Sequence, residues 1–166
     1  MRSIVLICHD IRSTHNVGSL LRTAEGLGVT KVYLSGYTPY PRAANDTRLP
    51  HLSAKLDGQI HKTALGAEAS IPWEHAEDIH LLLRQLHTDN FRLVALEQTS
   101  SSVPLPSFNP DQHRNIALLL GREVEGIDPA LLALVDDVVE IPMFGRKESF
   151  NVVQAAAMAL YHFRFR

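Results

Sequence analysis

Short apolar runs alternate with longer helical patterns along the chain, and this alternation constrains the fold more than any other feature. Residues 3–8 are apolar almost without interruption, as is typical of a strand covered on both faces. Four further strands are expected over residues 31–35, 91–97, 115–121 and 137–142. Helices are expected over residues 16–28, 75–90 and 128–135, and from about residue 150 onward. This order predicts a single α/β domain over residues 1–166, with a mainly parallel sheet flanked by helices.

The segment 36–66 departs from the alternating pattern. Pro39, Pro41 and Pro50 interrupt it, so we expect a long, loop-rich connection with two short helices. Connections of this length in a compact domain usually carry a function of their own.

Composition excludes several classes of protein. The formal net charge of -2 argues against a histone-like nucleic-acid binder, although a local basic patch remains compatible with it. No HExxH motif or Cys/His cluster occurs, so we expect no metal site. The apolar runs are too short to cross a membrane, and the first lacks the cleavage site of a signal peptide. Cys8 is the only cysteine, so we expect a cytoplasmic protein with Cys8 packed in its core.

Four polar loops follow the expected strands. Ligands of parallel sheets bind beyond the carboxyl ends of the strands, where these loops lie. The loops cover residues 8–16, 95–100, 119–126 and 140–149. We therefore expect a ligand site at this edge of the sheet.

Three stretches in or beside these loops carry candidate functional residues. In the first, "NVGSLLRTA", Asn16 begins a helix, Gly18 permits close approach of a backbone or ligand, and Arg22 follows. An ordinary helix cap with a solvated arginine explains this stretch equally well. The second, "GREVEG" from Gly121 to Gly126, is neither a Walker loop nor GxGxxG, and taken alone a plain tight turn explains it better.

The third stretch, "IPMFGRKESFNVVQAAA", begins at Ile141 and leads into an alanine-rich helix. Ser149 is a candidate N-cap of that helix, which would be a purely structural role. The alanines permit close helix packing.

Together and in this order, the three stretches resemble the motifs of the SpoU/TrmH family of RNA ribose methyltransferases, within the SPOUT superfamily. The family pattern is an Asn-x-Gly-x-x-x-Arg-x-Ala helix start, a Gly-x-Glu-x-x-Gly turn, and an Ile-Pro-Met…Ser-Leu-Asn-Val segment. The resemblance covers nearly the whole chain. Arg122 stands where Asn is usual and Phe150 where Leu is usual, departures that could alter substrate preference.

The resemblance implies an α/β knot, in which the C-terminal segment threads through a loop to form a trefoil. It also implies S-adenosyl-L-methionine as the methyl donor and a ribose 2′-hydroxyl as the acceptor. The catalytic residues carried over are Asn16, Arg22, Glu123, Ser149 and Asn151. Those carried over for the cofactor are Leu96, Gly121, Ile141, Met143 and Ser149.

The resemblance also suggests a role for each catalytic side chain. Ser149 would hydrogen-bond the substrate or the cofactor. Arg22 would grip the substrate phosphate and stabilise the forming alkoxide, because a guanidinium is a poor base as it stands. Action of Arg22 as the base itself is the less favoured alternative. Glu123 would anchor the Arg22 side chain, and the two asparagines would orient the ribose or Arg22.

The family works as a homodimer, so we expect a homodimer here, formed by the first and last helices. RNA is the expected partner, with tRNA favoured over rRNA because the chain resembles the minimal tRNA-modifying members without an appended RNA-binding domain. The candidate RNA contacts are Arg12, Arg42, Arg48, Lys62, Arg122 and Arg146. A catalytically silent RNA-binding module of the same fold is the main alternative. An oxidoreductase is disfavoured, because GxGxxG with a following acid is missing.

Overall fold

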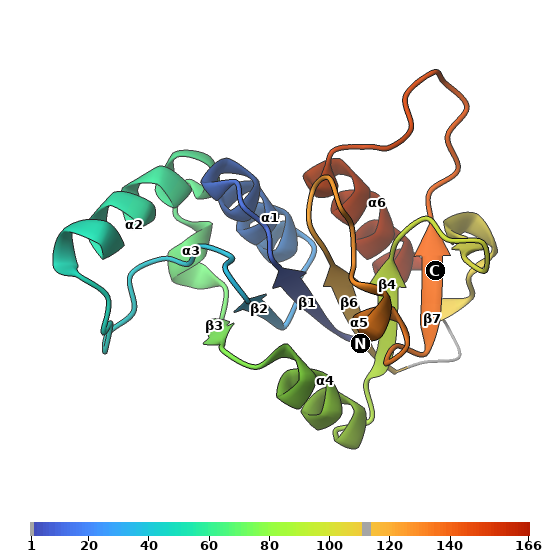
Figure 1. The fold of residues 1–166 in the computed structure, drawn as a ribbon, viewed down its shortest axis with the longest axis horizontal. Coiled ribbons are helices and arrows are strands. Elements are labelled where there is room, and N and C mark those ends of the chain that lie inside the picture. Colours follow the sequence, from blue (N-terminus) through green and yellow to red (C-terminus); the bar gives the residue numbers. More distant parts are fainter. Residues whose placement is uncertain (1, 111–113) are drawn as a thin grey trace.

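A seven-stranded sheet forms the centre of the computed structural model, which describes residues 2–110 and 114–166 (Figure 1). The strand order is β3-β2-β1-β6-β4-β7-β5, and every neighbouring pair runs parallel. The strands are β1 (Ser3–His9), β2 (Lys31–Ser35), β3 (Trp73–Ala76), β4 (Arg92–Leu96), β5 (Val103–Pro104), β6 (Asn115–Leu120) and β7 (Asp137–Glu140). The α-helices are α1 (Thr14–Gly26), α2 (Pro50–Ala64), α3 (Ala67–Ser70), α4 (Ile79–Thr88), α5 (Pro129–Leu132) and α6 (Val152–Phe165). A short 3-10 helix, η1, covers Leu105–Ser107.

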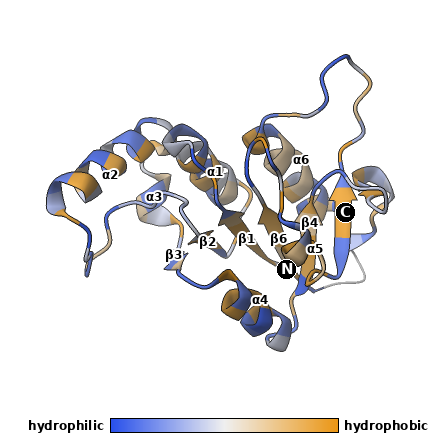
Figure 2. Ribbon diagram, viewed as in Figure 1, coloured by the Kyte–Doolittle hydropathy of each residue, from blue (hydrophilic) through white to orange (hydrophobic). Residues whose placement is uncertain are grey.

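Helices cover both faces of the sheet, which explains the unbroken apolar runs. Ile4, Leu6 and Cys8 of β1 pack into one core with α1 and α6. Val5 and Ile7 point the other way and pack against α4 and α5. Figure 1 shows α1 and α6 on one side of the sheet and α4 on the other, and Figure 2 shows the apolar colouring concentrated on β1 and β6. Because successive side chains of a strand alternate between faces, a strand buried on both must be apolar throughout.

Gly18 is needed where α1 and α2 touch. A Cβ at Gly18 would lie 2.3 Å from Ile60 O and 2.2 Å from Thr63 Oγ1. The Thr63 hydroxyl also donates a hydrogen bond to His15 O across this contact, at 2.9 Å. The close approach predicted at Gly18 is therefore made by the backbone of another helix of the same chain.

The structure confirms the α/β class and the parallel sheet, and it corrects several boundaries. β3 and β5 were not expected, because they are a four-residue strand of mixed polarity and a two-residue edge strand containing Pro104. The segment 36–66 contains one 15-residue helix, α2, rather than two short ones. The final helix begins at Val152, two residues later than expected.

Cys8 lies in the core, as expected, and burial raises the pKa of its thiol to about 12. Within residues 2–110 and 114–166, no helix combines the length and apolar character needed to cross a membrane.

Candidate active site

A cavity of about 280 Å³ opens beyond the carboxyl ends of β4, β6 and β7. It is bounded by the loops after these three strands and by the segment that enters α6. Its lining residues are Leu96, Glu97, Gln98, Leu120, Gly121, Arg122, Glu123, Val124, Gly126, Glu140, Ile141, Glu148, Ser149, Phe150, Val152 and Ala155. The ligand site expected at this edge of the sheet therefore has a physical counterpart, in which the second and third stretches meet.

The turn from Gly121 to Gly126 forms one wall of the cavity. Arg122 and Gly126 exchange two backbone hydrogen bonds of 3.2 Å, which close the turn. A Cβ at Gly121 would lie 2.8 Å from the backbone of Gly126, so only glycine fits there. Gly126 has a φ of +73° and a Cβ there would lie 2.3 Å from Glu97 Oε2, so it also requires glycine.

Glu97 joins the loops after β4 and β6. One of its oxygens accepts a hydrogen bond from Ile127 N at 2.9 Å, and the other accepts one from Gln98 N at 2.9 Å. Sequence reasoning did not select Glu97, because a carboxylate at the end of a strand carries no local sign of a partner 30 residues away.

Glu123 connects the second stretch to the first. Its carboxylate accepts hydrogen bonds from Arg12 N, Ser13 N and Asn16 Nδ2, each of 3.2 Å. Burial acts to raise the pKa of Glu123, but these hydrogen bonds outweigh it and the pKa lies below its usual value. Glu123 is therefore held as a carboxylate at the start of α1.

Two asparagines extend this connection to the third stretch. Asn151 Nδ2 donates to Asn16 Oδ1 at 3.4 Å, and Asn151 Oδ1 accepts from Val153 N at 2.9 Å. Asn151, not Ser149, is therefore the N-cap of α6. Ser149 lies in the wall of the cavity instead. The structure thus brings together Glu123, Asn16 and Asn151, three of the five predicted catalytic residues.

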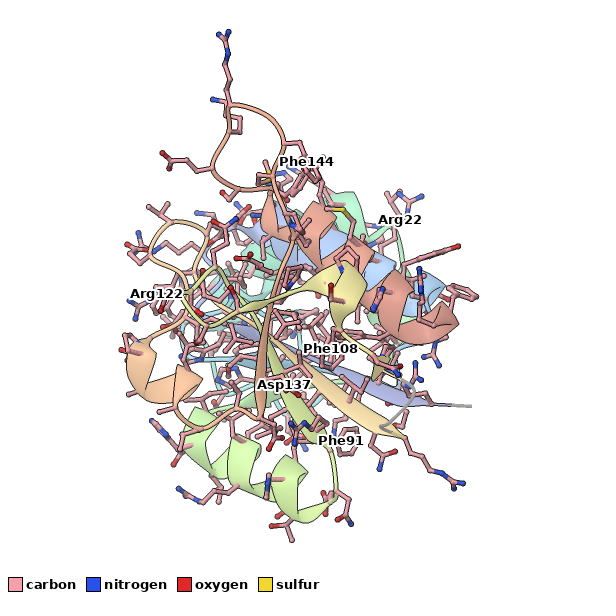
Figure 3. All side chains as sticks on the ribbon, turned by 90° about the vertical axis from the view of Figure 1, so that its right-hand side faces the viewer. Arg22, Phe91, Phe108, Arg122, Asp137 and Phe144 are labelled. Carbon is pink, nitrogen blue, oxygen red and sulfur yellow. The ribbon has the colours of Figure 1, made fainter. Side chains whose placement is uncertain are left out.

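Arg22 lies apart from this cluster. Its side chain is exposed on α1, and Figure 3 shows it well separated from Arg122. Within the described part of the chain, the Arg22 side chain makes no hydrogen bond or ion pair, and it is not part of the cavity wall. The expectation that Glu123 anchors Arg22 is not met within this chain, because the donors on Glu123 are those at the start of α1.

Four of the five residues predicted to hold the cofactor line the cavity: Leu96, Gly121, Ile141 and Ser149. Met143 is partly buried and lies outside the lining. The lining combines apolar side chains with exposed backbone and carboxylates, which is a common composition for a small-molecule site.

The predicted RNA contacts divide into three groups. Arg42, Lys62 and Arg146 are exposed, the first two on or near α2 and the third in the loop before α6. Arg48 is only 14% exposed and donates to Asp46 and to the backbone oxygens of Tyr40 and Pro41. Arg48 is therefore not expected to contact RNA, because its N–H groups already donate hydrogen bonds within the 40–48 loop. Arg12 and Arg122 belong to a separate cluster.

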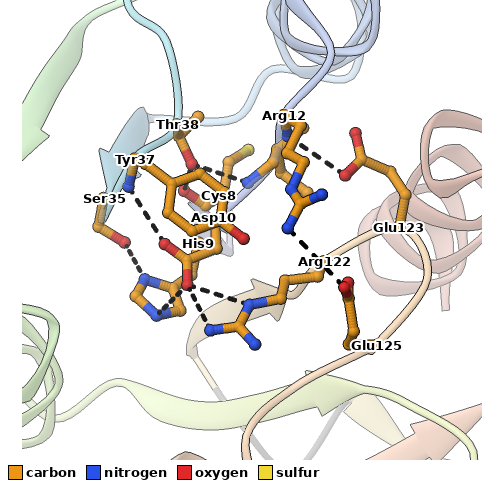
Figure 4. Close-up of polar contacts among 11 residues, drawn as sticks. Cys8, His9, Asp10, Arg12, Ser35, Tyr37, Thr38, Arg122, Glu123 and Glu125 are labelled. Carbon is orange, nitrogen blue, oxygen red and sulfur yellow. Dashed lines mark hydrogen bonds and ion pairs between the residues drawn. The ribbon is translucent and has the colours of Figure 1, made fainter.

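That cluster surrounds Asp10, which sequence reasoning also missed (Figure 4). Asp10 is only 6% exposed and has a φ of +58°. Its Oδ2 accepts hydrogen bonds from Arg122 Nη2 at 3.1 Å and from Arg122 Nε at 3.3 Å. Its Oδ1 accepts one from Tyr37 N at 3.1 Å. His9 Nε2 lies 3.5 Å from Asp10 Oδ2, and burial lowers the pKa of His9. A buried carboxylate thus ties together the loops after β1, β2 and β6.

Comparisons with known proteins point to one family. A family model described as "SpoU rRNA Methylase family" matches residues 3–161. The 23S rRNA (guanosine-2′-O-)-methyltransferase RlmB of Bordetella pertussis is 28% identical over 159 residues, which are 96% of this chain and 58% of that protein. The chain therefore spans a little over half the length of such relatives.

Solved structures share the fold. An AdoMet-bound rRNA methyltransferase from Sinorhizobium meliloti superposes with a TM-score of 0.81 at 21% identity, covering 99% of this chain and 57% of that one. A TrmH/SpoU tRNA modifying enzyme from A. aeolicus superposes with a TM-score of 0.79 at 19% identity, covering 99% of this chain and 75% of that one.

Proposed function

This chain belongs to the SpoU rRNA methylase family, and we propose that it transfers a methyl group from S-adenosylmethionine to a ribose 2′-hydroxyl of RNA. The observation that carries the proposal is the meeting of the second and third motifs at one cavity, to which the first motif is joined by a hydrogen bond. The glycine turn and Ser149 line this cavity, and Glu123 links the turn to Asn16.

The residues that line the cavity fit the chemistry of the proposed cofactor. Leu96, Ile141 and Val152 supply apolar walls for a planar adenine, and the adjacent backbone supplies hydrogen-bonding groups for its edge. Glu148 and Glu140 place carboxylates at the cavity, where a cationic amino group would be favoured. When bound, S-adenosylmethionine supplies a methyl group on a positively charged sulfur, a leaving group that needs no metal.

The chain's own residues then position and activate the acceptor hydroxyl. A ribose hydroxyl is a weak nucleophile until its proton leaves, and we assign this proton to solvent water. We assign Arg22 to the substrate phosphate and the developing alkoxide, since a guanidinium stabilises negative charge and is a poor base. Asn16 and Asn151 would fix the ribose, because each keeps hydrogen-bonding capacity beyond their mutual contact.

The position of Arg22 supports a homodimeric enzyme. Arg22 is exposed and outside the cavity of its own chain. In the proposed dimer, α1 and α6 form the interface and the arginine of one subunit approaches the cavity of its partner. The trefoil knot is part of the same proposal, and the fold shared with the solved family members supports it.

A direct test separates this activity from the alternatives. Isothermal calorimetry should detect binding of S-adenosylmethionine and no binding of NAD. The Arg22→Ala variant should bind S-adenosylmethionine with unchanged affinity but lose methyl transfer to RNA. Binding of S-adenosylmethionine with no transfer by the wild-type protein to any cellular RNA would favour the silent RNA-binding module instead.

We further predict that the RNA substrate is tRNA rather than rRNA. The named relatives act on both kinds, according to their descriptions. Mapping ribose methylation in RNA from cells with and without the gene will distinguish them. A missing methyl group in rRNA alone would contradict the tRNA prediction. RNA binding should weaken steeply with salt in either case, because phosphate contacts release counterions.

A further inference from the structure

An exposed tyrosine lies beside the cavity, in a cluster that the proposed mechanism does not use. Tyr37, in the loop after β2, is 48% exposed. The guanidinium carbon of Arg12 lies 5.7 Å from the centre of its ring, within the range of a cation–π contact. Arg122 lines the cavity and binds Asp10, which in turn binds Tyr37 N. The backbone of Tyr37 is thus connected to the cavity wall through Asp10, which accepts a hydrogen bond from Tyr37 N and forms an ion pair with Arg122 (Figure 4).

The backbone on both sides of Tyr37 is fixed. Gly36 has a φ of +63°, and a Cβ there would lie 2.0 Å from Asp10 Oδ1. Thr38 is 2% exposed, and its hydroxyl accepts a hydrogen bond from Ile11 N at 3.0 Å. The tyrosine ring is therefore presented to solvent by a well-anchored loop. Pre-organisation of this kind lowers the entropic cost of binding.

The charges of the cluster are arranged with the positive ends outward. The Arg122 side chain is 38% exposed, whereas the side chain of its partner Asp10 is 9% exposed. The Arg12 side chain is 69% exposed and its partner Glu125, at 3.8 Å, is 51% exposed. An exposed pair at this distance contributes little and opens readily. Near Tyr37, each guanidinium is therefore more exposed than the carboxylate that it pairs with.

We propose that Tyr37, Arg12 and Arg122 form a subsite for an unstacked RNA base and its phosphate, next to the nucleotide whose ribose is methylated. The aromatic ring stacks on the base, and Arg12 leaves Glu125 to bind the phosphate. Proteins that recognise single-stranded RNA commonly combine an aromatic face with guanidinium groups in this way. The subsite rests on the proposed function, and it adds that the enzyme selects RNA in which the bases beside the target are unpaired.

Fluorescence of a labelled RNA tests the stacking. The probe is a single-stranded RNA of about 12 nucleotides carrying 2-aminopurine at central positions, compared with the same strand in a duplex. The wild-type protein should bind the single strand more tightly and quench its fluorescence. Tyr37→Leu should weaken binding roughly ten-fold and abolish the quenching, and Tyr37→Phe should retain both, because an aromatic face suffices.

Two exposed charges provide variants that do not depend on the folding of the Tyr37 loop. Arg12→Ala should reduce the slope of the logarithm of the RNA-binding constant against the logarithm of the salt concentration by about 1, the value for one lost phosphate contact. Glu125→Gln should tighten RNA binding, because Arg12 then loses its ion pair with residue 125.

Arg84→Ala is the matched control, since Arg84 is exposed on α4 and this helix packs on the other face of the sheet. It should behave as the wild type.

Each outcome separates the subsite from the wider proposal. The affinity for S-adenosylmethionine should be unchanged in every variant. If the wild-type protein does not bind S-adenosylmethionine at all, that result would contradict the proposed function rather than the subsite. Equal RNA binding by Tyr37→Leu and the wild type would overturn the subsite. A change in the oligomeric state of Tyr37→Leu, with RNA binding intact, would overturn it as well and assign the ring to a protein interface.

Discussion

Replacing Gly18 by alanine tests whether the glycine of the first motif serves helix packing or ligand binding. A Cβ at this position would lie 2.2 Å from Thr63 Oγ1, 2.3 Å from Ile60 O and 2.9 Å from Ala64 N. Two of these atoms belong to the backbone, so α1 and α2 would have to separate. Adding a methyl group to a contact with no free space typically costs about 1 to 3 kcal/mol.

Two other contributions decide the net effect. Separation of the helices would weaken the hydrogen bond from Thr63 to His15 O, at a cost of about 1 kcal/mol. Alanine is favoured over glycine within a helix by about 1 kcal/mol, which offsets this loss. Gly18→Ala should therefore lower the free energy of unfolding by about 1 to 3 kcal/mol.

Gly58→Ala is the matched control. Gly58 lies inside α2, and a Cβ there would meet no atom within 4 Å. Only the preference of a helix for alanine over glycine then affects stability. This variant should therefore raise the free energy of unfolding by about 0.5 to 1 kcal/mol.

Urea unfolding, followed by circular dichroism at one protein concentration, measures both variants, because the stability of an oligomer depends on concentration. Calorimetry with S-adenosylmethionine completes the test. If Gly18→Ala is stabilised as much as Gly58→Ala but binds the cofactor or RNA more weakly, the glycine serves a ligand and the packing explanation is wrong.

Two further predictions concern the polar residues around the cavity. Asn151→Ala should lower the free energy of unfolding by about 1 kcal/mol, because it removes the N-cap of α6. Ser149→Ala should change the free energy of unfolding by less than about 0.5 kcal/mol and should weaken S-adenosylmethionine binding. Equal destabilisation by both variants in urea unfolding would contradict the assignment of the cap. Glu123 has a lowered pKa in the folded state, so its stabilising contribution is present above its ordinary pKa in the unfolded chain and is lost as the pH falls through the folded value. Urea unfolding of Glu123→Gln and the wild type from pH 7 down to pH 3 should show a difference that shrinks toward acid; a constant difference would mean that the carboxylate charge contributes nothing.

Much of the fold was open to prediction because the sheet is covered on both faces. β1 and β6 are continuous apolar runs, and a strand buried on both sides has no other composition available to it. β3 and β5 could not be predicted, since short edge strands are defined by their hydrogen bonds to a neighbour rather than by their own residues. The helix α2 was expected as two short helices rather than one of 15 residues, because the prolines before it obscured its start.

The candidate site was predicted only where the motif residues themselves meet. Gly121 and Ser149 were selected from the sequence, and both line the cavity. Asp10 and Glu97 were not selected, because each acts on a segment distant in the sequence. Arg48 was selected for its charge, but its donors are directed into its own loop.

The sequence by itself determined the α/β class, the family and the three stretches that carry its motifs. These depend on periodicity and on residue order, which are local properties of a chain. Only the tertiary structure decided what each polar group binds: Glu123 holds the start of α1, Asn151 caps α6, and Asp10 pairs with Arg122. A hydrogen bond requires two groups within about 3 Å of each other, and for residues more than 100 positions apart, such as Asp10 and Arg122, only folding can bring them that close.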